Sequence, residues 1–119
     1  MEEGKDTLLE LIRKDRRYPL QAYIFVFEAL SHTVEKIGER RHITGRELLE
    51  GIKELALKHF GGLTKLVFSQ WNVGSTEDFG EIVFNLVDAG LMGRTELDSK
   101  DDFKDGYNFD EVFNIHSKQ

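Results

Sequence analysis

The chain has 119 residues, 39% of them hydrophobic and 32% charged, with one proline, no cysteine and a formal net charge of −6 at pH 7. This length and apolar content suit a single domain over residues 1–119 with its own hydrophobic core, which excludes general disorder. The absence of cysteine excludes disulfides, thiolate catalysis and cysteine-based metal centres.

The sequence also indicates where the protein resides. No segment approaches the roughly 20 apolar residues that span a bilayer, and MEEGKDTLLELIRKD lacks the basic-then-apolar order of an export signal. We therefore expect a cytoplasmic protein with no membrane partner, and frayed ends near residues 1–5 and 114–119.

The hydrophobic pattern predicts two helices in the first 38 residues. The segment LLELI, residues 8–12, marks a short amphipathic helix that ends within the charged RKDRR stretch. Pro19 suits the first turn of a second helix over residues 19–37, and Gly38 suits its end. Six apolar residues of this helix recur at steps of three and four and are expected to face the core. They are Leu20, Tyr23, Phe27, Leu30, Val34 and Ile37.

A capping box predicts the start of the third helix. Thr44 and Glu47 stand three residues apart ahead of an apolar run, so each side chain can bond the other residue's backbone N–H. Gly61 and Gly62 are expected to end this helix. Gly51 lies inside it, where glycine costs about 1 kcal/mol relative to alanine. Either another segment packs closely against Gly51, or this glycine is exposed and neutral.

Two more helices are predicted before residue 90. A short one covers residues 63–71, and a longer one begins at Ser75 or Thr76 and ends at Gly90. Gly80, inside the longer helix, leaves the same two alternatives open as the glycine of the third helix.

The pattern changes after Gly90. LMGRTELD and GYNFDEVF are short, partly alternating runs separated by the acidic stretch SKDDFKD, and we interpret them as a β-hairpin, with RHIT as a candidate edge strand. The chain is therefore predicted to be mainly α, with about five helices and a C-terminal β-hairpin in an order that resembles a winged helix. An all-helical bundle with an irregular tail is the alternative architecture.

The acidic stretch matches a calcium-binding loop only in part. With Gly106 at the sixth loop position, Asp101 and Asp105 take the first and fifth positions. Phe103 and Val112 then fall at the third and twelfth, where oxygen ligands are required. We therefore predict a solvated turn at Asp105 and Gly106 rather than a metal site.

Other catalytic and metal-binding patterns are not found. Glu28, His32 and Glu35 share one face of the second helix, but no other helix repeats the pattern, so we interpret them as a solvated charged face. The sequence has no nucleophile elbow, no H-E-x-x-H pair and no phosphate-binding glycine loop. We expect no cofactor and assign no catalytic residue, and an enzyme with an unrecognised site ranks third among the functional hypotheses.

Charge is unevenly distributed along the chain. Residues 1–70 carry 12 Lys and Arg against 11 Asp and Glu, a net +1, whereas residues 71–119 carry 4 against 11, a net −7. An acidic surface favours a basic partner and repels phosphate backbones. We therefore expect an interaction or regulatory module that presents an acidic C-terminal face to a protein partner or to a second copy of the chain. The residues of this predicted face are Asp78, Glu81, Asp88, Glu96, Asp98, Asp101, Asp102 and Asp105.

Two basic clusters, at residues 13–17 and 40–46, indicate nucleic-acid binding as the alternative function. A winged-helix protein normally presents positive residues on its recognition helix and wing, whereas the corresponding segments here are acidic. Nucleic acid is therefore the less favoured partner. The candidate contacts are Arg13, Arg16, Arg17, Arg40 and Arg41.

Four segments carry a resemblance to a known family: RYPLQAYIFVFEAL, HITGRELLEGIKELALKHFG, STEDFGEIVFNLVDAGLM and DGYNFDEVF. They are similar to an uncharacterised bacterial family of small proteins, grouped chiefly from Planctomycetes and Verrucomicrobia, and the similarity runs from about Leu8 to Phe113. The resemblance implies a stand-alone bacterial domain. It brings no activity, cofactor or catalytic residue to this chain.

Overall fold

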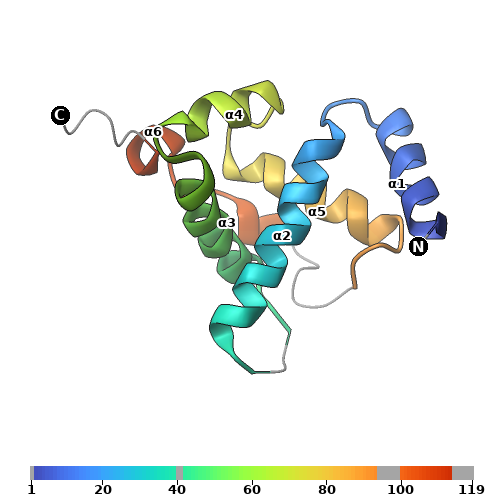
Figure 1. Ribbon diagram of the computed structural model, residues 1–119, viewed down its shortest axis with the longest axis horizontal. Helices are drawn as coiled ribbons and strands as arrows, with labels where there is room; N and C mark the ends of the chain where they lie inside the picture. The colour runs from blue at the N-terminus through green and yellow to red at the C-terminus, as the bar shows by residue number, and fades with distance from the viewer. Residues whose placement is uncertain (1, 40–41, 94–99, 114–119) are drawn as a thin grey trace.

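The computed structural model describes residues 2–39, 42–93 and 100–113, which form a mainly helical fold (Figure 1). All five predicted helices are present, and the first is longer than expected because it starts at residue 2. The elements in chain order are α1 (Glu2–Lys14), α2 (Leu20–Ile37), α3 (Gly45–Phe60), the 3-10 turn η1 (Gly61–Leu63), α4 (Thr64–Gln70), α5 (Thr76–Asp88), the 3-10 turn η3 (Lys100–Phe103) and α6 (Phe109–Val112).

The predicted β-hairpin is not supported. No strand occurs in the described residues, and residues 100–113 form η3, a turn at Asp105 with φ 49°, and the single turn of α6. The Asn108 side chain caps α6 by accepting the N–H of Glu111 at 3.2 Å. The aromatic residues of this segment pack into the helical core instead of pairing across a sheet. The winged-helix arrangement therefore lacks a wing in the part of the chain that is described, and residues 94–98 of the predicted hairpin lie outside it.

The predicted helix-end signals are confirmed. Thr44 Oγ1 accepts the N–H of Glu47 at 3.1 Å, and Glu47 Oε1 accepts the N–H of Thr44 at 3.0 Å, which completes the capping box of α3. Gly38 and Gly90 follow α2 and α5 with φ 77° each, a left-handed conformation that glycine adopts without strain.

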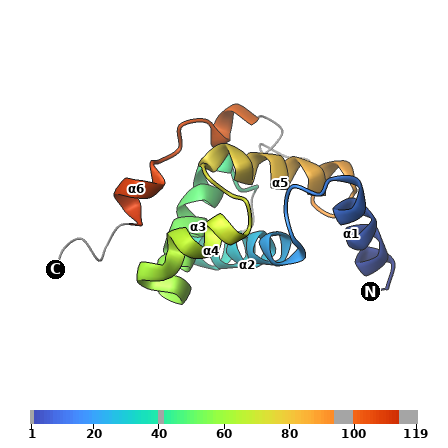
Figure 2. The same cartoon turned by 90° about the horizontal axis from the view of Figure 1, so that it is seen from above.

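The core lies where α2, α3 and α5 meet. Figure 2 shows α5 between α2 and the segment that contains η3. Phe68 of α4 joins the last elements to this core, because its ring centroid lies 5.2 Å from that of Phe79 on α5 and 5.4 Å from those of Phe109 and Phe113. The C-terminal segment is thus part of the core rather than an irregular tail.

Close packing explains both glycines inside the helices. A Cβ added at Gly51 would lie 1.8 Å from Thr33 Oγ1 of α2, and one added at Gly80 would lie 2.9 Å from Phe103 Cβ of η3. Both distances are too short for any side chain, so α3 packs on α2, and η3 on α5, through these positions. Of the two alternatives raised by the sequence, close approach is the one observed.

The face of α2 that is buried differs from the predicted stripe. The buried residues are Ala22, Tyr23, Phe25, Val26, Ala29 and Thr33. Of the predicted stripe Tyr23 is buried, and Phe27, Leu30 and Ile37 are partly buried against the core, whereas Leu20 and Val34 are 36% and 43% exposed. The reason is that α2 carries apolar residues on several sides and charged residues on one, so that helical periodicity is compatible with more than one stripe. The core covers one of them and leaves another facing solvent.

Candidate interaction surfaces

An apolar row lies on the solvent side of α2. We call it the outer row; it consists of Leu20, Ile24, Phe27, Ser31 and Val34, separated by steps of four, three, four and three. These steps keep all five side chains on one side of the helix. Ile24, Val34 and Leu20 are 44%, 43% and 36% exposed, whereas Phe27 is partly buried and packs against the core. The row runs over 15 residues, which are 14 steps of 1.5 Å or about 21 Å along the helix.

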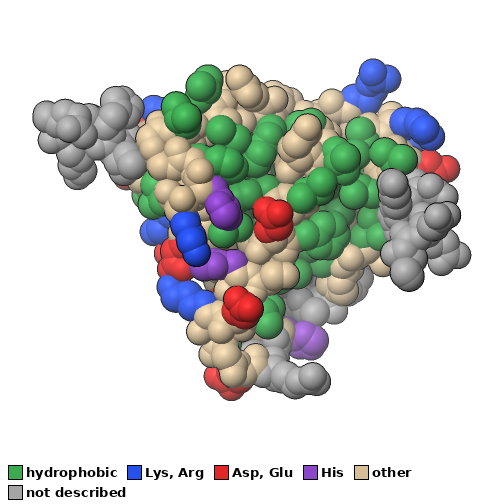
Figure 3. Space-filling model, in the orientation of Figure 1, with side chains coloured by type: hydrophobic (Ala, Val, Ile, Leu, Met, Phe, Trp, Pro, Cys, Tyr) green, Lys and Arg blue, Asp and Glu red, His purple; other side chains and the backbone are tan. Residues whose placement is uncertain are grey.

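Figure 3 shows the face of the molecule that α2 crosses. Hydrophobic side chains gather over α2 and extend toward α1 and α4 on either side of it. The exposed apolar residues outside α2 are Leu9 of α1, Leu63 of η1 and Leu66 of α4, at 39%, 61% and 56%. An apolar area of this kind on a small protein is typical of a contact surface.

Two carboxylates accompany the outer row. Glu28 and Glu35 stand seven residues apart, so they project from the same side of α2, and both are exposed. Neither forms an ion pair or a hydrogen bond with any other residue that the structure describes. The outer side of α2 therefore combines an apolar row with two negative charges that no described residue neutralises.

The remaining charged residues of α2 point to α3 instead. His32 Nε2 lies 3.1 Å from Glu54 Oε1, and the Lys36 ammonium binds the other oxygen of the same carboxylate. Lys36, and then His32, lower the pKa of Glu54 by hydrogen bonding to it. His32 is thus engaged by α3, whereas Glu28 and Glu35 are exposed to solvent, so the predicted charged face is divided between a contact with α3 and two solvated carboxylates.

Several acids of the predicted acidic face act inside the fold. Asp78 accepts the Tyr18 hydroxyl at 2.6 Å and the Gly74 N–H at 2.8 Å, which fixes the start of α5. Burial, and then this hydrogen bond, raise the pKa of Tyr18 well above its usual range. Asp102 Oδ2 accepts the N–H of Gly45 at 3.3 Å, at the N-terminus of α3, where a negative charge is favourable.

The other residues of the predicted acidic face are not gathered into one site. Asp88, Asp101 and Asp105 are exposed, on α5, on η3 and in the turn that follows η3. Glu96 and Asp98 lie outside the described residues. The chain therefore keeps some acidic side chains accessible, but it uses others as caps and hydrogen-bond acceptors.

The first basic cluster is partly neutralised. Arg17 Nη2 lies 2.7 Å from Asp15 Oδ2 and 3.3 Å from Glu81 Oε1, so a further member of the predicted acidic face is engaged by a predicted nucleic-acid contact. The Arg17 guanidinium, followed by Asn85, holds the pKa of Asp15 well below its usual range. Arg13 and Arg16 are exposed and line an open hollow of about 430 Å³ beside Arg17. Residues 40 and 41 lie outside the described residues.

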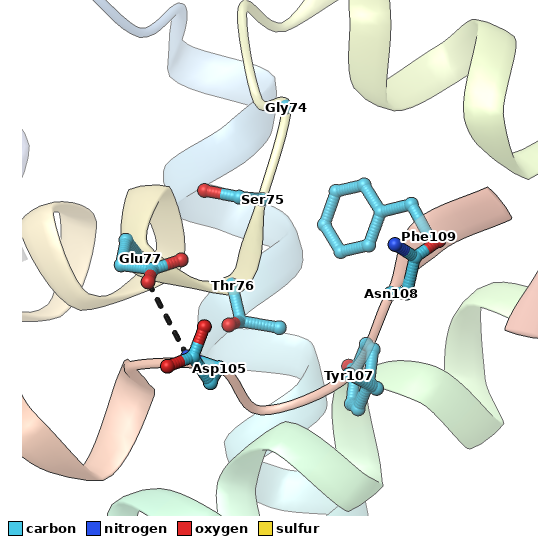
Figure 4. A pocket seen from close by; sticks show the side chains of 8 residues that line it. All are labelled: Gly74, Ser75, Thr76, Glu77, Asp105, Tyr107, Asn108 and Phe109. Atoms are coloured by element: carbon cyan, nitrogen blue, oxygen red, sulfur yellow. Dashed lines mark hydrogen bonds between the residues drawn. The ribbon is translucent and has the colours of Figure 1, made fainter. Parts of the chain in front are cut away.

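A second hollow, of about 340 Å³, opens at the start of α5 (Figure 4). Its polar groups bond within the chain. Thr76 Oγ1 donates to the Phe103 carbonyl at 2.6 Å and accepts the Gly106 N–H at 3.0 Å, and Glu77 accepts the Asp105 N–H at 3.3 Å. The hydrogen bonds at this hollow therefore hold the C-terminal segment on α5.

Tyr107 anchors the same segment to α3. Its hydroxyl donates to the Leu49 carbonyl at 2.7 Å, and burial raises the pKa of this phenol well above its usual range. The position of Tyr107 therefore ties the C-terminal segment to α3.

Residues 2–39, 42–93 and 100–113 contain no group of three or more His, Asp or Glu side chains that could hold a metal ion. None of the helices they form combines the length and the apolar character needed to cross a membrane.

Comparison with known proteins finds no matching family model, no matching curated protein and no matching solved structure. The bacterial family resemblance therefore stays an expectation. Function has to be argued from the surfaces of this chain. The outer row was not anticipated, although its signal is present in the sequence as an apolar composition on both sides of the second helix.

Proposed function

We propose that the chain is a small cytoplasmic protein-interaction module whose docking surface is the outer row of α2. One observation carries this proposal: α2 buries one apolar face in the core and still exposes Ile24, Val34 and Leu20 at 44%, 43% and 36%. A helix that carries apolar residues on two opposite sides is normally covered on both. A partner that binds α2 would bury the side chains of the outer row that the chain itself leaves exposed.

The exposed area sets the scale of this contact. Full burial of a Leu, Ile or Val side chain contributes roughly 1.5–3 kcal/mol, so covering what remains exposed contributes roughly 0.5–1.3 kcal/mol for each residue. Leu20, Ile24 and Val34 together give about 2–4 kcal/mol. Association costs at least about 4 kcal/mol in lost freedom of motion. A stable complex therefore requires contacts beyond these three side chains, from neighbouring apolar residues and from charges.

The acidic C-terminal face and the basic cluster are the competing surfaces. Asp78 and Asp102 already accept hydrogen bonds inside the fold, and Arg17 is paired with two carboxylates. Using them for a partner requires breaking these bonds. The side chains of the outer row lose nothing when a partner covers them, which is why we place the docking surface on α2.

The experiment compares partner recovery by two variants with that of the wild type. Ile24→Glu with Val34→Glu places charge on the outer row, whereas the matched control Asp88→Asn with Asp101→Asn changes two exposed acids of the predicted acidic face. A partner recovered from the source cells by the wild type is then purified, and its affinity is measured by calorimetry. We expect at least a tenfold weaker affinity for the α2 variant and an unchanged affinity for the control.

Circular dichroism checks that both variants fold, which is expected because all four positions are exposed. If the partner is lost with the control and kept by the α2 variant, docking belongs to the acidic face and the proposal is wrong. Retention of nucleic acid at low salt, abolished by Arg13→Ala with Arg16→Ala, would assign the function to the basic cluster instead.

A further inference from the structure

The outer row has the spacing of a coiled-coil seam. Apolar residues at alternating steps of four and three let a second helix lie along the first, with its side chains inserted between those of the row. Leu20, Ile24, Phe27 and Val34 supply the apolar positions, and Ser31 is a small polar residue among them. A small residue leaves room for a larger side chain of the partner. The row therefore matches a helix in shape, about four turns long over its 21 Å.

The charges beside the row are all of one sign. Glu28 and Glu35 directly follow Phe27 and Val34, so they flank the row on one side and repeat at the interval of one heptad. Both are exposed and, among the described residues, have no partner. The one basic residue of α2, Lys36, is bound to Glu54 of α3. The edge of the docking surface is thus negative and open to an incoming positive charge.

Resting on the proposed function, we infer that the partner segment is an amphipathic helix of about four turns that carries Lys or Arg one heptad apart, opposite Glu28 and Glu35. Charge complementarity selects this occupant. Apolar side chains of the partner cover the outer row, and its basic side chains neutralise the two carboxylates at the edge of the contact.

A second copy of the chain fits this surface less well. Two copies of α2 packed antiparallel bring Glu28 of each copy to the same side, where like charges repel. Packed in parallel, Glu28 and Glu35 face the positions of Tyr23 and Leu30, which carry no positive charge. Neither orientation neutralises the glutamates, so a basic helix from another protein is favoured.

The test uses synthetic helical peptides of 18 residues as probes. One carries leucine at the seam positions and lysine at the flanking positions, a second replaces the lysines by glutamate, and a third keeps the composition of the first with the seam scrambled. Binding to the full chain is measured by fluorescence anisotropy. We expect the lysine-flanked peptide to bind at least tenfold more tightly than either of the other two.

Two double variants of the protein locate the charge effect. Glu28→Gln with Glu35→Gln removes two charges from the edge of the row, and the matched control Asp88→Asn with Glu111→Gln removes two exposed charges elsewhere. We expect the first to weaken binding of the lysine-flanked peptide roughly threefold to tenfold, the range of two exposed ion pairs, and the control to leave it unchanged. This difference should vanish near 1 M salt, where the screening length is about 3 Å.

Several results would overturn the inference. Equal binding of the lysine-flanked and glutamate-flanked peptides removes the argument from charge, and an equal loss in both double variants assigns the attraction to the net charge of the whole chain. A wild-type dimer in sedimentation that Ile24→Glu dissociates makes a second copy the occupant. If no peptide binds and Ile24→Glu with Val34→Glu still loses the cellular partner, this inference fails while the proposed function stands.

Discussion

Gly51 offers the sharpest test of how α2 and α3 pack. An alanine Cβ at this position would lie 1.8 Å from Thr33 Oγ1, 3.2 Å from Thr33 Cβ and 3.3 Å from the Ala29 carbonyl oxygen. Turning the Thr33 hydroxyl away relieves only the shortest of these contacts. It also breaks the hydrogen bond of 2.7 Å that this buried hydroxyl donates to the Ala29 carbonyl. The Gly51→Ala variant must therefore leave the buried hydroxyl unpaired and, because two close contacts remain, also move the two helices apart.

The opposing contributions can be compared. Alanine gains about 1 kcal/mol over glycine in helix propensity. Overpacking costs about 1–3 kcal/mol, and an unsatisfied buried hydroxyl costs about 1–3 kcal/mol more. We expect Gly51→Ala to lower the free energy of unfolding by about 1–5 kcal/mol, so packing outweighs helix propensity.

Urea unfolding measures this change, followed by far-ultraviolet circular dichroism and by the fluorescence of Trp71, whose ring lies 5.3 Å from that of Phe25. Gly62→Ala is the matched control, because nothing lies within 4 Å of its added Cβ. In a Thr33→Ala background the cost of Gly51→Ala should fall by at least about 1 kcal/mol, since the two residues are in contact. An unchanged midpoint for Gly51→Ala, or strict additivity of the two substitutions, would refute this account of the helix contact.

Two further predictions concern the C-terminal segment and the pH dependence of stability. Thr76→Val removes the hydroxyl that bonds the Phe103 carbonyl and the Gly106 N–H. We expect the free energy of unfolding to fall by about 1–3 kcal/mol, and amide exchange to accelerate more in residues 100–113 than in α3. Equal acceleration in both segments would contradict a role of Thr76 in holding the C-terminal segment. Arg17 lowers the pKa of Asp15 in the folded chain. The ionised Asp15 therefore stabilises the folded state above the unfolded pKa of about 3.9, and this stabilisation is lost as the pH falls through the folded pKa. Asp15→Asn should therefore cost roughly 0.5–1 kcal/mol at pH 7, discounted for exposure, and progressively less below pH 4; a cost that persists at acidic pH would show that the charge is not responsible.

The ends of the helices could be predicted from the sequence, because the residues that determine them lie close together in the chain. The capping box of Thr44 and Glu47 requires only two side chains three residues apart, and both of its hydrogen bonds are formed. The helix ends at Gly38 and Gly90 likewise depend on a single residue, because each requires only a residue that tolerates positive φ. Such features depend little on what the rest of the chain does.

The parts that could not be predicted depend on distant contacts. Residues 107–113 have the alternation of a strand, yet Phe109 and Phe113 pack on Phe68 of α4, some 40 residues earlier in the chain. A local cue was present, because Asn108 precedes Glu111 at the spacing of a helix cap, and that cue was missed. Packing decided the outcome, as it does for short segments of weak propensity.

The candidate surface was unpredictable for a related reason. Periodicity shows that α2 has apolar residues at steps of three and four, but it does not say which of several apolar stripes the neighbouring helices cover. The contact of Gly51 with Thr33 places α3 on one side of α2. That contact leaves Ile24 and Val34 on the opposite, exposed side.

The burial of the C-terminal aromatic residues affects how the chain folds during its synthesis. Phe103 and Phe113 are completely buried, and Phe113 covers Phe68. A ribosome delivers α1 to α5 before these residues, so the nascent helices spend an interval with the centre of the domain uncovered. During that interval Phe68 lacks the cover of Phe113, and apolar surface exposed in this way favours aggregation until the last aromatic residues have emerged.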